Sequence, residues 1–145
     1  MRFFLCIWIL FYTTFLLGQK EDHQWVFNWA SRDDLSAYPD AGASILDFNY
    51  LPPRAYKNED ITLDIQETNS FYADENGQLL LYTNGQAVYG ANHKAITNGD
   101  TINYGRIWDI WTWKNEHDEV SSVGFRIEQG ISIIPIGMDA TNFMV

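Results

Sequence analysis

The side chains that most often carry out chemistry are few and scattered in this sequence. Its three histidines are His23, His93 and His117, and no two of them have the short spacing typical of a metal site. A zinc site needs three or four converging ligands, so these histidines do not predict one. His93 lies in a segment rich in asparagine and glycine, where we expect it to make a hydrogen bond in a turn or between strands.

Oxygen donors alternate in one tight turn, where Asp74 and Asn76 precede Gly77. A calcium ion takes six to eight oxygens, and this short turn offers only part of such a shell. Asp74 and Asn76 are therefore weak metal candidates. The competing interpretation is a hairpin turn in which Asp74 bonds its own backbone. We expect no metal and no cofactor.

Acidic residues occur in pairs at Asp33 and Asp34 and at Asp118 and Glu119, with Glu116 nearby. Glycoside hydrolysis uses two carboxylates about 5 to 9 Å apart, but sequence neighbours do not set that distance, and solvated loops collect such pairs. The sequence has no nucleophile elbow, phosphate-binding glycine loop or zinc-protease motif. Its one cysteine lies in the first apolar run. No catalytic residue is predicted.

Three tryptophans gather at Trp108, Trp111 and Trp113. If this segment is a strand, Trp111 and Trp113 share one face and Trp108 lies on the other. Exposed aromatic faces stack on sugar rings, whereas buried ones contribute to the core, as we expect for Trp25 and Trp29. The three clustered tryptophans are therefore weak candidates for a ligand platform.

Short strands separated by turns must position these residues. Asn-Gly pairs at 76–77, 84–85 and 98–99 indicate turns. No long helical stripe occurs, so the predicted fold class is all-β. Alternating or continuous apolar residues predict strands at 25–30, 44–48, 61–65, 78–83, 123–127 and 131–136, of which 78–83 and 131–136 are expected to be buried on both faces.

Two parts of the sequence look like imperfect copies of one strand–turn–strand unit. The first covers residues 69–82 and the second residues 130–145, with an irregular insertion at about 90–121. Such a repeat is typical of β-propeller blades. Phe143, Met144 and Val145 form an apolar strand without a following partner, so we expect a partial β-propeller: the first blade and the start of a second. The chain would then be the N-terminal part of a larger protein.

The first residues are typical of an export signal. Arg2 precedes an apolar run over residues 3–17, and Gly18 then leads into a polar stretch. We expect residues 1–18 to be a signal peptide and residues 19–145 an incomplete β-propeller-like domain. An uncleaved anchor is the alternative, although the run is shorter than the roughly 20 residues of a membrane span. The expected location is secreted or at the outer cell surface, without a stable membrane span after cleavage.

The charge of the chain argues against strongly anionic partners. Among 145 residues, 19 acidic side chains outnumber 9 basic ones, and the net charge is −10. Such a surface repels the phosphates of nucleic acids and the headgroups of anionic lipids. Hydrophobic residues make up 46% of the sequence, which indicates a folded protein rather than a disordered tail.

Several ordered motifs resemble one family of exported proteins. Residues 74–85, Asp-Glu-Asn-Gly-Gln-Leu-Leu-Leu-Tyr-Thr-Asn-Gly, resemble a signature in the N-terminal β-propeller-like region of large secreted proteins of Bacteroidota. Residues 44–48, 92–100 and 129–135 resemble further segments of that family, in the same order. The resemblance covers about residues 25–145. It implies surface display or release by type IX secretion and does not imply a reaction.

Together these patterns favour a non-catalytic exported scaffold or adhesion module whose partner is a protein or a glycan. Two alternatives stay open. One is a fragment of a secreted glycan-degrading enzyme whose catalytic residues lie beyond Val145. The other is a small carbohydrate-binding β-sandwich, which would lose polysaccharide binding in Trp111→Ala.

Overall fold

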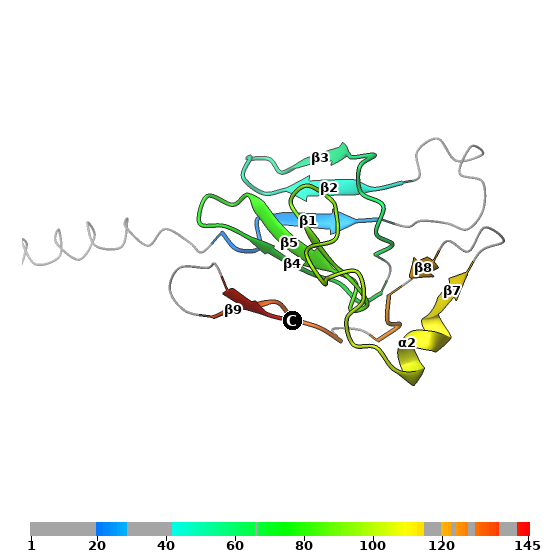
Figure 1. Cartoon of the computed structure of the whole chain (residues 1–145). Helices are drawn as coiled ribbons and strands as arrows, with labels where there is room; N and C mark the ends of the chain where they lie inside the picture. Colours follow the sequence, from blue (N-terminus) through cyan, green and yellow to red (C-terminus); the bar gives the residue numbers. More distant parts are fainter. Residues whose placement is uncertain are drawn as a thin grey trace, which may run out of the picture.

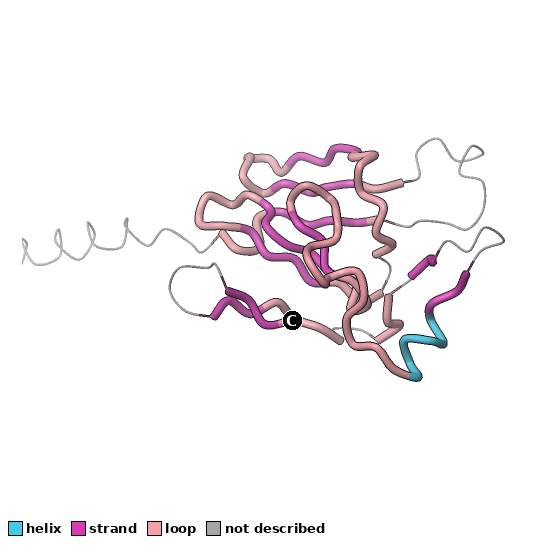
Figure 2. The backbone as a smooth tube through the Cα atoms, viewed as in Figure 1, coloured by secondary structure: helices cyan, strands magenta, loops and turns pink. Residues whose placement is uncertain are grey.

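The computed structural model describes residues 20–28, 42–65, 67–114, 120–122, 124–127, 130–136 and 142–145. In this part of the chain, short antiparallel strands form two three-stranded sheets and two two-stranded sheets, and α2 (Arg106–Trp111) is a short helix (Figures 1 and 2). The all-β prediction is confirmed. The strands are β1 (Gln24–Phe27), β2 (Ser44–Asp47), β3 (Arg54–Lys57), β4 (Ser70–Ala73), β5 (Leu79–Thr83), β6 (Val88–Gly90), β7 (Thr112–Lys114), β8 (Val120–Ser122), β9 (Ile134–Ile136) and β10 (Asn142–Met144).

The first sheet has the antiparallel order β1-β2-β3. Side chains of β1 alternate, so that Gln24 and Val26 are buried while Trp25 and Phe27 are exposed. Ile45 of β2 lies opposite Val26 and is also buried. The prediction that Trp25 belongs to the core is wrong, because the two-residue period of the strand places it on the outer face, where it is 38% exposed.

The second sheet has the antiparallel order β4-β5-β6 and contains the predicted hairpin at 69–82. Tyr82 of β5 lies opposite Phe71 of β4 and Tyr89 of β6, and these three side chains pack at the core. The predicted strand at 78–83 is confirmed as β5. Its continuous apolar sequence has a physical reason, because other elements pack against both faces of this sheet.

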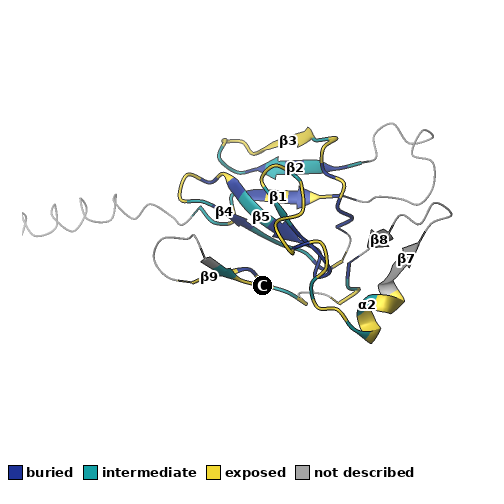
Figure 3. Cartoon of the chain, viewed as in Figure 1, coloured by how far each residue is buried: buried dark blue, intermediate teal, exposed yellow. Residues whose placement is uncertain are grey.

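Side chains from both three-stranded sheets meet in one core in the described part of the chain. Tyr82 is fully buried there. Figure 3 shows the contrast between the buried stretches of β4 and β5 and the exposed edge strand β3. Full burial of a valine, leucine or isoleucine side chain contributes about 1.5–3 kcal/mol to folding. The buried members of this core are Val26, Ala43, Ile45, Ile61, Leu63, Ile65, Leu79, Tyr82 and Ala87.

Residues 61–65 depart from the predicted strand in one respect. Ile61, Leu63 and Ile65 are buried, as their alternation predicts, but only Ile65 forms a β-bridge, to Asn28. The side chain of Asn28 replaces a neighbouring strand: its Nδ2 donates to the carbonyls of Ile61 at 3.2 Å and Leu63 at 2.9 Å. The strand prediction is therefore wrong, because side-chain amides satisfy this backbone.

The turn between β5 and β6, residues 83–87, is polar and almost fully buried. Oδ1 of Asn84 accepts two backbone N–H groups of the turn, each at 3.0 Å, and its Nδ2 donates to the Asp64 carbonyl at 3.0 Å. Gly85 has a φ of 87°, and a Cβ there would lie 2.8 Å from the ring of Phe125. Only glycine combines this backbone conformation with so close an approach.

Segments distant in sequence attach to the 83–87 turn. Oε1 of Gln86 accepts the N–H of Gly124 at 2.9 Å, and the N–H of Phe125 donates to the Asn84 carbonyl at 3.2 Å. The predicted strand at 123–127 is therefore wrong for the described residues 124–127. Their backbone bonds to this turn and to the hydroxyl of Thr68 instead of to a neighbouring strand.

The second predicted hairpin, within residues 130–145, is formed by β9 and β10. It packs against β4, where the rings of Tyr72 and Phe143 lie 5.0 Å apart in an edge-to-face arrangement. The prediction of a strand over 131–136 buried on both faces is wrong. The strand is limited to β9, and Ile134 and Ile136 are 53% and 50% exposed, because no described element covers their side of the hairpin.

The segment expected to be an irregular insertion, 90–121, contains α2, β7 and the start of β8. Its first part folds back on β6, where the N–H of Val88 donates to the Gly99 carbonyl at 2.7 Å. In the described part of the chain, no helix has the length and apolar character needed to cross a membrane.

The buried turn yields a stability prediction. Asn84→Ala removes one donor and an acceptor that serves two buried N–H groups. Unpaired buried polar groups cost about 1–3 kcal/mol each, so we expect a loss of roughly 3 kcal/mol or more in the free energy of unfolding, measured by urea denaturation. The matched control is Asn92→Ala, because Asn92 is exposed and its Oδ1 accepts only the N–H of Lys94. Equal losses in the two variants would contradict the assignment.

Candidate ligand-binding surface

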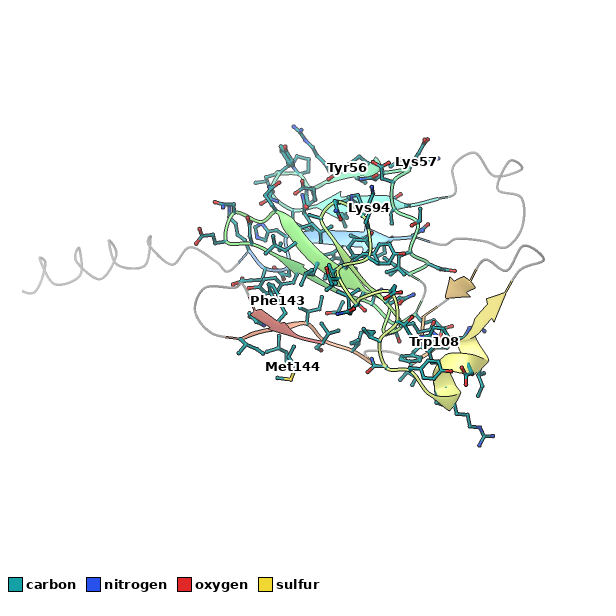
Figure 4. The ribbon with its side chains drawn as sticks, viewed as in Figure 1. Tyr56, Lys57, Lys94, Trp108, Phe143 and Met144 are labelled. Carbon is teal, nitrogen blue, oxygen red and sulfur yellow. The ribbon has the colours of Figure 1, made fainter. Side chains whose placement is uncertain are left out.

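An exposed aromatic ring lies just before α2. Tyr104 is 72% exposed, and its ring packs against the half-buried Trp108 with the ring centres 5.3 Å apart and tilted by 50°. Ile107 and Ile110 on the helix are also exposed. Figure 4 labels Trp108 on α2. The arrangement presents a flat ring to solvent with a second ring behind it, which suits stacking on a sugar ring or on another apolar group.

The backbone around Tyr104 is held by the 83–87 turn. The N–H of Ile102 donates to the Gln86 carbonyl at 2.8 Å, and Nδ2 of Asn103 donates to the Gly85 carbonyl at 3.1 Å. Nε2 of Gln86 in turn donates to the Trp108 carbonyl at 3.2 Å. These bonds lie on both sides of Tyr104, so the exposed ring is mounted on a fixed segment and would lose little freedom on binding.

Helix α2 exists because of this tertiary support. It has 6 residues, too few to be stable alone. The N–H of Asp109 donates to the Gly105 carbonyl at 3.0 Å and closes its first turn. The indole Nε1 of Trp108 is buried and has no hydrogen-bond partner among the described residues. The Trp108 ring is therefore held by packing rather than by its own polar group.

The three clustered tryptophans do not lie on one strand, which was one interpretation of the sequence. Trp108 and Trp111 belong to α2, and Trp113 belongs to β7. The segment is therefore not one strand that gives Trp111 and Trp113 a common face, because α2 ends at Trp111 and β7 begins at Thr112. The side chains of Trp111 and Trp113 lie outside the described part of the chain. Sequence reasoning missed Tyr104, whose spacing of four residues from Trp108 was the available signal.

The candidate metal turn uses its carboxylate for backbone bonds. Oδ1 of Asp74 accepts the N–H groups of Asn76 at 2.9 Å and Gln78 at 2.8 Å. These bonds lower the pKa of Asp74, with that from Gln78 having the largest effect. The described residues contain no group of three or more His, Cys, Asp or Glu side chains placed to hold a metal. Asp74 and Asn76 are thus seen as parts of a hairpin turn.

His93 makes the kind of turn hydrogen bonds that its sequence context predicts. Oδ1 of Asn58 accepts the N–H of Asp60 at 3.0 Å, so its Nδ2 donates to Nε2 of His93 at 2.9 Å. The ring is then neutral with its proton on Nδ1, which donates to the Tyr82 hydroxyl at 3.2 Å. Burial lowers the pKa of His93 and raises that of Tyr82. Tyr82 is buried, and the half-buried His93 and Asn58 spend their polar atoms on these bonds.

Of the remaining candidates, His23 lies in the described part of the chain. Nδ1 of His23 lies 3.2 Å from Oδ1 of Asn49, whose Nδ2 donates to the Gly77 carbonyl at 2.6 Å, so both residues support the 74–77 turn. Trp29, Asp33, Asp34, Glu116, His117, Asp118 and Glu119 lie outside the described residues.

A second aromatic surface lies on the outer face of the first sheet. The ring of Trp25 is 5.0 Å from that of Phe48 and 6.3 Å from that of Phe27, and Phe27 continues to Phe71 of β4 at 6.4 Å. Nε1 of Trp25 donates to the Asp22 carbonyl at 2.8 Å. These rings pack mainly on one another, so this face offers less free ring surface than Tyr104.

Comparison with known proteins adds no relative: no family model, no curated protein and no solved structure matches this chain.

The His93 bonds predict a pH dependence of stability. Burial places the folded-state pKa of His93 below its ordinary value of 6.5, although the charge of Asp60 acts in the opposite direction. The unfolded chain therefore binds this proton more tightly. The free energy of unfolding falls as the pH decreases below about 6.5, and this fall ends below the folded-state pKa. Urea midpoints measured between about pH 7.5 and 5 should show it.

The comparison variants isolate the contribution of His93. His93→Asn should show a smaller fall, and asparagine tolerates the φ of 57° at this position. The control Asn92→Ala changes an exposed residue that does not titrate and should keep the wild-type fall. Indistinguishable pH profiles for wild type and His93→Asn would show that the histidine is not held neutral.

Proposed function

We propose that this protein is a non-catalytic, exported binding module that attaches a surface or secreted protein to a neutral glycan. The carrying observation is the Tyr104 ring, which is exposed, backed by Trp108 and fixed on both sides by bonds to the 83–87 turn. The net charge of −10 favours a neutral glycan, since anionic polysaccharides would be repelled.

The wider setting of the module is also part of the proposal. The apolar run at residues 3–17 supports export, and the ordered motifs support membership in the β-propeller-like region of large exported Bacteroidota proteins. Small antiparallel sheets such as β4-β5-β6 are compatible with blades of that architecture. On this interpretation the chain supplies the first blade and the start of the next.

A binding role accounts for the described polar groups better than catalysis does. Three of the residues with shifted pKa values are engaged in structural bonds: Asp74 closes a hairpin turn, and His93 and Tyr82 bond each other. General acid–base catalysis instead needs a group within reach of a bound substrate. Tyr104 meets the simpler requirement of a binding surface, because its ring is open to solvent.

The proposal predicts glycan binding that depends on Tyr104. The protein is run in affinity electrophoresis through gels that contain one neutral glycan each: a β-glucan, a mannan or a chitin free of cationic chitosan. At least one of these glycans should retard it. Tyr104→Ala should weaken that binding about tenfold or more, which corresponds to about 1.4 kcal/mol. The matched control Tyr50→Ala removes another exposed tyrosine, which packs on Arg54, and should bind as wild type does. If none of the neutral glycans retards the protein, the proposal is overturned.

A further inference from the structure

The indole N–H of Trp108 is a buried hydrogen-bond donor that lacks an acceptor. Nε1 of Trp108 makes no hydrogen bond within the described part of the chain. Trp25 shows the usual arrangement, because its Nε1 donates to the Asp22 carbonyl at 2.8 Å. A buried N–H that loses water without gaining a partner costs free energy, so such groups are rare in folded proteins. An unpaired donor at a binding surface is suited to an acceptor that the ligand supplies.

The donor belongs to the ring on which Tyr104 packs. The ring centres of Tyr104 and Trp108 lie 5.3 Å apart, and the ring planes are tilted by 50°. Ile107, the neighbour of Trp108 on α2, is 51% exposed and adds an aliphatic side chain to the same surface. One small area therefore combines an exposed ring, an exposed aliphatic side chain and an unpaired N–H.

These surroundings select the kind of acceptor. A hydroxyl is a poor match for a donor among apolar side chains, because its own O–H would lose water there without a partner. An amide carbonyl only accepts, so it pairs the indole N–H and brings no unpaired donor of its own. Carboxylates and sulfates also accept, but the net charge of −10 repels them. A neutral amide carbonyl is therefore the acceptor that fits best.

Acetamido groups place such a carbonyl on neutral sugars. We propose that Nε1 of Trp108 donates a hydrogen bond to the acetamido carbonyl of an N-acetylhexosamine, so that the glycan bound at Tyr104 is built of N-acetylated sugars. The acetyl methyl packs on Ile107, and the sugar ring stacks on Tyr104. This inference rests on the proposed function, because it names the class of glycan for the same surface.

Access to Nε1 comes from rotation of the Tyr104 side chain. Tyr104 is 72% exposed, so its ring is held by few neighbours besides Trp108. Exposed side chains change rotamer rapidly, whereas the backbone here stays fixed by the bonds of Ile102 and Asn103 to the 83–87 turn. The acetamido group enters the space that the turned ring leaves on Trp108, and Tyr104 remains available to stack on the sugar.

The test compares a chitin oligosaccharide with a cello-oligosaccharide of equal length, because these β-linked chains differ only by an acetamido group or a hydroxyl on each sugar. Calorimetric titration of the full chain should show at least about tenfold tighter binding of the chitin oligosaccharide. Trp108→Phe removes the N–H and keeps an aromatic ring. It should abolish the preference by weakening chitin binding about tenfold, and it should leave cello-oligosaccharide binding unchanged. The matched control Trp25→Phe should keep the wild-type preference, because Nε1 of Trp25 already has an acceptor within the chain.

Nuclear magnetic resonance gives a readout on the unaltered protein. The indole N–H signal of Trp108 is identified by its absence from the spectrum of Trp108→Phe. Adding the chitin oligosaccharide should move this signal downfield, because a hydrogen bond forms at Nε1, and the cello-oligosaccharide should move it less. A purely structural role of the Trp108 ring would not produce this difference, so the signal decides the question even if Trp108→Phe folds poorly.

Failure of this inference is distinguishable from failure of the proposed function. If Tyr104→Ala weakens binding of a neutral glycan but the chitin oligosaccharide binds no more tightly than the cello-oligosaccharide, the inference is overturned and the proposed function stands. The same holds if Trp108→Phe keeps the wild-type preference, or if a saturating amount of chitin oligosaccharide leaves the Trp108 indole signal in place. If no neutral glycan binds, both are overturned.

Discussion

A buried amide or carbonyl needs a hydrogen-bond partner, and residues 83–87 place many such groups inside the protein. Within the turn, Oγ1 of Thr83 donates to the Ala87 carbonyl at 2.6 Å and accepts the N–H of Gly85 at 3.0 Å. Groups that the turn cannot pair internally bond to residues 64, 102–108 and 124–125. The need to pair the buried polar groups of this turn therefore positions three segments: the core segment before β4, the segment that carries Tyr104, and residues 124–125, which precede the β9–β10 hairpin in the sequence.

Elements with local determinants could be predicted from the sequence. The β4–β5 hairpin follows from the Asn-Gly turn at 76–77 and the apolar residues beside it. β3 could not be predicted, because all four of its residues are exposed and no apolar face marks it. The 61–65 segment has the burial pattern of a strand, but the amide of Asn28 takes the place of a partner strand. Periodicity reports burial and does not report which group makes the hydrogen bond.

The sequence indicated which segment carries the candidate surface, but it did not predict how the side chains of that segment are arranged. The tryptophan-rich composition around residues 108–113 drew attention to the right segment. The helix that orients Trp108 is short and is supported from Gln86, more than twenty residues earlier in the chain, so no local pattern encodes it. Tyr104 lies outside the cluster, and the bonds that fix its flanks come from the distant 83–87 turn. Asp74 was identifiable because its bonds lie within its own turn. For His93 only the turn was predictable, because its side-chain partners Asn58 and Tyr82 lie 35 and 11 residues away in the sequence.

The long sequence separations across these bonds have a consequence for how the protein folds. Thr68 bonds to Ile127 across 59 residues, Ser70 to Ile133 across 63, and Gln24 to Leu79 across 55. Closing such loops costs chain entropy before the contacts repay it, which predicts slow folding. Hairpins such as β4–β5 can form early, but the polar turn loses its water only when the distant segments arrive. Tyr104 is therefore ordered in the same cooperative step that completes the core, so a partly folded chain would have strands without a binding surface.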